Sequence, residues 1–146
     1  MRARRRGGED GSAIVEIVWL GVLLLVPLLW IVLSVFEVQR GAFAVTSAAR
    51  SAARAYSLAD SDAVGRAQAQ AAIRQALDDQ GGDDQDFTFD VSCGGGDCHE
   101  AGAVITVRVW SGVDLPMLPE VLGGDAPSFR LDSTHTVPIG QFRDAG

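Results

Sequence analysis

The sequence IVWLGVLLLVPLLWIVLSVF, residues 17–36, determines how the rest of the chain is interpreted. It has twenty consecutive residues without a charge, and fifteen of them are Leu, Ile, Val or Phe. As a helix the stretch is about 30 Å long, which matches the hydrocarbon core of a bilayer. The fifteen residues favour insertion by roughly 5 to 9 kcal/mol, a total that Pro27 and Ser34 do not reverse. The sequence therefore predicts a transmembrane helix, kinked at Pro27.

The charges that flank this stretch predict its orientation. Arg40 is the first basic residue after it, whereas a cluster of four precedes it: Arg2, Arg4, Arg5 and Arg6. Because basic residues stay on the cytoplasmic side, the N-terminus is expected inside and the chain beyond about Glu37 outside. We expect a cytoplasmic leader (1–11), a transmembrane helix (12–36) in the cytoplasmic (inner) membrane and an extracytoplasmic domain (37–146).

The overall charge excludes nucleic acid as a partner. The chain of 146 residues has 12 basic residues, all Arg, against 19 acidic ones, a net charge of −7. Such a chain lacks the cationic surface that supplies most affinity for phosphate backbones.

A cleaved secretory signal is the alternative to an anchor. An Arg-rich start, an apolar run and Ala42-Phe43-Ala44 together resemble its three regions. The apolar run is longer than the roughly 7 to 15 residues of a signal, and charged residues separate it from the Ala pair. The anchor is therefore favoured.

Glu16 lies between apolar residues at the start of this stretch. A carboxylate inside a membrane is costly and is by default a functional hypothesis, whereas a carboxylate that reaches the headgroups has no special role. Both interpretations are open from the residues alone.

The segment GSAIVEIVWLGVLLLVPLLW, residues 11–30, resembles a known family. An Arg-rich leader, a Gly and a Glu at the fifth position after it resemble the class III signal of type IV pilins. The whole opening is similar to TadE-like pseudopilins of tight-adherence (Flp-type) pilus systems, except that Ile17 stands where relatives usually carry Phe or Tyr. The resemblance implies that a prepilin peptidase cuts after Gly11, which makes Ser12 the new N-terminus and Glu16 the fifth residue. It also implies other pilin or pseudopilin subunits and pilus assembly membrane proteins as partners.

Electrostatics gives Glu16 a role consistent with this resemblance. A freed α-amino group on Ser12 and a carboxylate attract each other far more strongly in lipid than in water. We therefore expect Glu16 to set the register of this subunit against a pilin-like neighbour.

Beyond the membrane the sequence predicts two helices. The stretch 37–57 has no Pro, and its apolar positions recur at spacings of three and four: Val38, Ala42, Val45, Ala49, Ala52 and Tyr56. The opposite face carries Arg40, Ser47, Arg50 and Arg54. A second helix is expected over 63–80, with Asp62 and Arg66 spaced for an ion pair and Gly81-Gly82 after its end.

The remaining chain alternates with a period of two. Apolar residues occupy every second position near 87–91, 105–109 and 129–137, which predicts three strands with one apolar face. The amphipathic helix is the available cover for that face. The expected fold is α+β and pilin-like: a long N-terminal helix, a second helix and a small antiparallel sheet.

Cys93 and Cys98 enclose a short Gly-rich turn, which outside the cell predicts a local disulfide. Zinc binding by these residues and His99 is disfavoured, because the spacing is wrong and a fourth ligand is missing. The acidic run Asp83, Asp84, Asp86 and Asp90 lacks the order of an EF-hand. We expect no metal and no cofactor.

No catalytic motif occurs: the chain lacks G-x-S-x-G, H-E-x-x-H and a phosphate-binding loop with Lys. His99 and His135 stand alone, and catalysis needs convergent groups. We therefore expect a non-enzymatic pilus assembly component. The alternative is a membrane-anchored extracytoplasmic binding domain with no pilus role.

Overall fold

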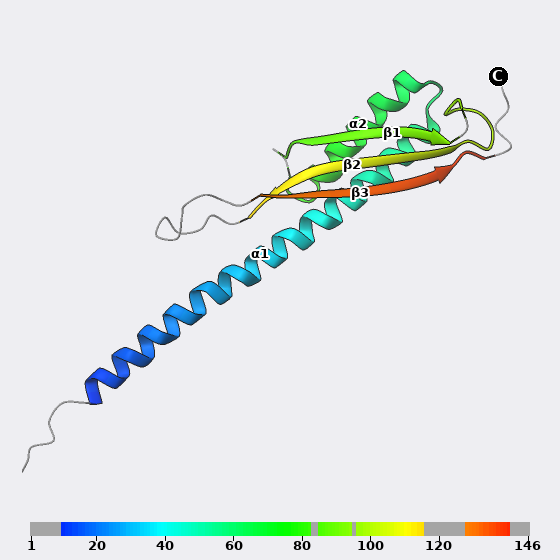
Figure 1. The fold of residues 1–146 in the computed structure, drawn as a ribbon. Coiled ribbons are helices and arrows are strands. Elements are labelled where there is room, and N and C mark those ends of the chain that lie inside the picture. The colour runs from blue at the N-terminus through cyan, green and yellow to red at the C-terminus, as the bar shows by residue number, and fades with distance from the viewer. Residues whose placement is uncertain (1–9, 83–84, 95, 116–127, 141–146) are drawn as a thin grey trace, which may run out of the picture. The chain divides into compact units, whose positions relative to one another are not determined.

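The computed structural model describes residues 10–82, 85–94, 96–115 and 128–140. Two helices precede three strands (Figure 1): α1 (Asp10–Leu58), α2 (Asp62–Asp78), β1 (Phe87–Gly94), β2 (Val104–Asp114) and β3 (Ser128–Pro138). The strands form one antiparallel sheet in the order β1-β2-β3. The α+β class, with a long N-terminal helix, a second helix and a three-stranded sheet, is confirmed. The chain divides into two compact units, Met1–Val35 and Phe36–Gly146.

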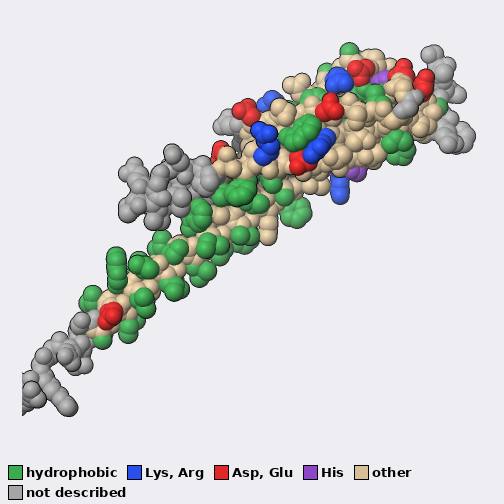
Figure 2. Space-filling view, in the orientation of Figure 1, with side chains coloured by type: hydrophobic (Ala, Val, Ile, Leu, Met, Phe, Trp, Pro, Cys, Tyr) green, Lys and Arg blue, Asp and Glu red, His purple; other side chains and the backbone are tan. Residues whose placement is uncertain are grey.

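In the first unit, α1 carries the apolar stretch. The helix continues through Pro27, although this residue lacks the N–H that the carbonyl of Leu23 would accept. Two turns later, the Ser34 hydroxyl donates to the Trp30 carbonyl at 2.8 Å. Hydrophobic side chains line this part of α1 on the face that Figure 2 shows. Apart from half-buried Trp30, the large apolar side chains from Ile14 to Val35 are between 42% and 70% exposed.

In the second unit, α1 has a buried face made of small residues. Two neighbouring positions are buried in each turn: Ala44 and Val45, Ala48 and Ala49, Ala52 and Ala53. Gly41 and Tyr56 are buried at the two ends of this face. Val45, Ala49, Ala52 and Tyr56 were expected here, but Ala42 is exposed and Val38 is only half-buried, so their assignment to the packed stripe was wrong in part. The stripe is wider than a single row because α1 contacts both the sheet and α2.

Close approach explains the small residues on α1. A Cβ on Gly41 would overlap the side chain of Val113 in β2 and lie 3.0 Å from Cδ1 of Leu131 in β3. Near the other end of this face, a Cβ on Gly65 in α2 would lie 2.9 Å from the ring of Tyr56. Glycine at these two positions therefore allows the helices and the sheet to pack at short distances.

The helix α2 begins and ends close to the expected residues. Ser61 is its N-cap residue, with extended backbone, but its side chain makes no capping hydrogen bond. The expected i,i+4 pair is present: Nε of Arg66 lies 3.2 Å from Oδ2 of Asp62. Ile73 and Leu77 are fully buried on the inner face of α2.

The sheet has one apolar face, as the alternation predicts. Val107 is the central residue, paired with Val91 in β1 and with His135 in β3. On β2 the residues Ile105, Val107 and Val109 are 0% exposed, and they form one hydrophobic core with residues of α1 and α2. The alternate positions of β2 lie on the opposite face of the sheet.

Candidate functional site

The first candidate site is the apolar segment of α1 with Glu16 at its start. Glu16 is exposed, and helical spacing puts it on one face with Leu20 one turn after it. Gly11 and Ser12 belong to the first turn of α1. The leader residues 1–9 lie outside the described part of the chain.

This segment is the part of α1 that is long and apolar enough to cross a membrane. Twenty uncharged residues separate Glu16 from Glu37, which corresponds to about 30 Å along a helix. Soluble monomers rarely expose contiguous apolar surface beyond a few hundred Å². Both ends of the segment carry a carboxylate, and Trp19 follows Glu16 within one turn.

A second feature is the turn after β1. Cys93 and Cys98 are joined by a disulfide, with their Cα atoms 5.3 Å apart. Both residues pack against the edge of the hydrophobic core. The expected pairing therefore agrees with the geometry of the turn.

Next to the disulfide, His99 stacks on Tyr56, with ring centroids 5.5 Å apart and ring planes 15° apart. Both ring nitrogens of His99 are buried and have no hydrogen-bond partner among the described residues. The Tyr56 hydroxyl donates to Oδ1 of Asp62, a contact between α1 and α2. The sequence did not reveal these contacts, because they join residues through tertiary packing.

This contact shifts two pKa values in opposite directions. Burial, followed by the hydrogen bond to the Asp62 carboxylate, raises the pKa of Tyr56 to about 12. The same hydrogen bond, supported by Arg66, lowers the pKa of Asp62 below its usual range. At neutral pH, Tyr56 is therefore a neutral donor and Asp62 an ionised acceptor.

No three His, Cys, Asp or Glu side chains gather as metal ligands within the described ranges. Asp83 and Asp84 of the acidic run lie outside those ranges. The structure brings Cys93, Cys98 and His99 together, but the disulfide occupies both sulfurs.

A third feature lies on the sheet face opposite the helices. Arg108 lies over the Trp110 ring, 5.0 Å from its centroid, and donates from Nε and Nη2 to Oδ2 of Asp132 at 3.1 and 2.8 Å. The sequence pattern did not reveal this group. The available signal was Trp110 itself, a large aromatic residue at a position where the alternation of β2 predicts a polar one.

Comparison with known proteins finds no matching family model, no similar curated protein and no similar solved structure.

Proposed function

We propose that this chain is a non-enzymatic subunit of a pilus assembly machine, similar to a TadE-like pseudopilin or minor pilin. Its α1 crosses the cytoplasmic membrane once, with the N-terminus inside and the α+β domain outside. The observation that carries the proposal is the start of the apolar part of α1: an exposed, uncharged helical stretch of 20 residues follows directly after Glu16, the fifth residue beyond Gly11.

Physical chemistry supports a role in assembly. An apolar helix stored in lipid can pack against other apolar helices without a large change in the polarity of its surroundings. Its transfer from a bilayer to an assembly of subunits therefore costs little free energy. Large hydrophobic side chains that are at least 42% exposed on the isolated chain are available for both environments.

Glu16 supplies the specificity in this proposal. A prepilin peptidase cuts after Gly11, and the new α-amino group on Ser12 is a cation at the same depth as a neighbouring subunit's carboxylate. In lipid, an unpaired carboxylate is costly and a paired one is much less so. Subunits are therefore held in the register that pairs these two charges.

The test compares Glu16→Gln with the matched control Glu37→Gln at the other end of the apolar stretch. Both variants are expressed as full chains, extracted from native membranes with mild detergent and affinity-purified. We expect both to fractionate with membranes, and only Glu16→Gln to recover several-fold less of the pilin-type subunits. Equal recovery with Glu16→Gln and wild type would refute the role of Glu16.

One observation favours the second candidate, an anchored extracytoplasmic binding domain. The sheet face opposite the helices carries an ordered aromatic and charged group around Trp110, which packing of the fold does not require. If the chain is only an anchor, Glu37→Gln and Glu16→Gln behave alike and no pilin-type subunit is recovered with wild type.

A further inference from the structure

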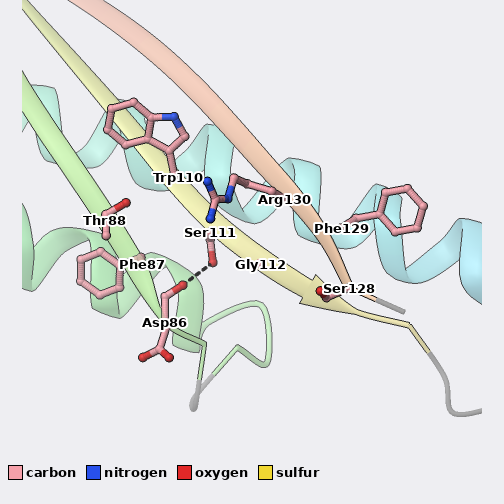
Figure 3. Close-up of a pocket in the computed structure, with 9 residues that line it drawn as sticks. All are labelled: Asp86, Phe87, Thr88, Trp110, Ser111, Gly112, Ser128, Phe129 and Arg130. Carbon is pink, nitrogen blue, oxygen red and sulfur yellow. Dashed lines mark hydrogen bonds between the residues drawn. The ribbon is translucent and has the colours of Figure 1, made fainter. Parts of the chain in front are cut away.

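A hollow of about 510 Å³ lies where β1 and β3 begin and β2 ends. Figure 3 shows its lining, which includes Thr88 from β1, Trp110 and Gly112 from β2, and Phe129 and Arg130 from β3. Trp110 and Gly112 lie on the face opposite the helices, because their neighbours Val109, Ser111 and Val113 are buried. The hollow therefore opens away from the hydrophobic core.

The missing side chain of Gly112 creates the floor of this hollow. Gly112 pairs with Arg130 across the two strands. A Cβ on Gly112 would meet no atom within 4 Å, so the space above it is open. Neighbouring Ser111 is anchored on the other side, because its hydroxyl donates to the main-chain oxygen of Asp86 at 3.0 Å.

Trp110 is held in place beside this floor. The guanidinium of Arg108 covers one face of the indole, and Asp132 holds that guanidinium. The remaining indole edge carries the N–H group, which in Figure 3 faces the guanidinium of Arg130. No hydrogen bond from this N–H to another described residue is present.

Arg130, which is exposed, is the second donor beside this floor. Ion pairs within the described ranges join Arg66 to Asp62 and Arg108 to Asp132, and neither involves Arg130. The nearby carboxylate of Asp86 points away from the guanidinium in Figure 3. Two groups that can only donate, the Trp110 N–H and the Arg130 guanidinium, therefore converge on open space.

We infer that this hollow binds a carboxylate of a partner polypeptide. A guanidinium and an indole N–H complement a carboxylate in charge and in hydrogen-bonding capacity. A sugar ring would require an open aromatic face, and Arg108 covers one face of Trp110. The inference concerns the sheet alone and does not depend on the pilus role.

The test uses the full chain in nanodiscs, with ¹⁵N in the indole rings. Trp19 and Trp30 in the apolar segment serve as internal references for non-specific effects. The probes are the peptides acetyl-Val-Glu-Val-amide and acetyl-Val-Gln-Val-amide at equal concentrations. We expect the Glu peptide to shift the Trp110 N–H resonance saturably, and the Gln peptide to shift none of the three resonances.

Two variants locate the site. Arg130→Gln is expected to lower the affinity for the Glu peptide at least fivefold. Gly112→Val fills the floor of the hollow without a clash and is expected to abolish the shift of the Trp110 resonance. Arg50→Gln, an exposed position on α1, is the control and leaves binding unchanged. Thermal unfolding of each variant verifies that the domain is folded.

Four results would overturn the inference. These are an equal shift with the Gln peptide, binding that survives Arg130→Gln, and tighter saturation by galacturonate than by the Glu peptide. The fourth is a shift of the Trp110 resonance caused by Glu120→Gln without any peptide, which would mean that the chain supplies its own carboxylate.

Discussion

Replacing Gly41 by Leu tests the packing of α1 against the sheet. A Cβ at this position overlaps Val113 and lies 3.0 Å from Leu131, and Leu adds three more carbons in that direction. Forcing extra carbons into a packed site costs about 1 to 3 kcal/mol, and this insertion falls at the upper end. Leu gains about 1 kcal/mol over Gly from helix propensity. The net expectation is a loss of about 2 kcal/mol in the free energy of unfolding.

The matched control is Gly21→Leu in the same helix, where an added Cβ meets no atom within 4 Å. Unfolding of the full chain in detergent is followed by the fluorescence of Trp110, with Trp19 and Trp30 replaced by Phe. Gly21→Leu is expected to leave the midpoint unchanged. Val113→Ala combined with Gly41→Leu is expected to recover about half of the loss, because it frees the overlapped space. A Gly41→Leu chain as stable as wild type would show that α1 does not approach the sheet here.

Four further predictions concern the second unit. Tyr56→Phe removes the hydrogen bond to Asp62 and is expected to cost about 1.5 to 3 kcal/mol, measured by urea unfolding at pH 7. Because the pKa of Tyr56 is raised to about 12, wild type should lose stability as the pH rises from about 10 to 12, and Tyr56→Phe should not. Since the pKa of Asp62 is lowered, its contribution is present above about pH 4 and lost below it; a flat acid limb in wild type would contradict this. Reduction of Cys93–Cys98 should lower stability by about 2 kcal/mol, and a thiol that reacts with iodoacetamide in unreduced mature protein would disprove the disulfide. Ile73→Ala should cost about 2 to 5 kcal/mol and Ile73→Val about 1, and equal losses would contradict full burial.

The strands show what could be predicted from the sequence. Alternation near 105–109 predicted which face of β2 is buried, and Ile105, Val107 and Val109 are all 0% exposed. In a strand with one buried face, the apolar residues of the alternating pattern identify that face. A shift of the pattern by one residue would turn every apolar side chain to the opposite face of the sheet. The pattern of a single strand contains no information on which residue of β3 pairs with which residue of β2.

That missing information explains why the group around Trp110 was not predicted. Arg108 and Asp132 are 24 residues apart, and their contact follows from the pairing of Trp110 with Asp132 across β2 and β3. The same holds for the stacking of His99 on Tyr56, which requires the turn after β1 to fold onto α1. Such contacts depend on tertiary packing rather than on local spacing.

The helix α1 is an intermediate case. Its amphipathic character was predicted, but Ala42 was assigned to the wrong face. Spacings of three and four residues select one row of positions along a helix. The sheet and α2 both pack against α1, so α1 buries two neighbouring positions in each turn. The partner of the second side, α2, becomes evident only when Gly65 is seen to lie against Tyr56.

The N-terminal residue of the chain extracted from native membranes tests the account most directly. Edman sequencing or mass spectrometry of that material is predicted to find Ser12 as the first residue, since cleavage after Gly11 is what makes Glu16 the fifth residue of a pilin-type subunit. Met1 at the N-terminus of membrane-bound material would instead indicate a plain anchor, and Val45 at the N-terminus of soluble material would indicate a secreted protein. Either of these two results would contradict the proposed processing.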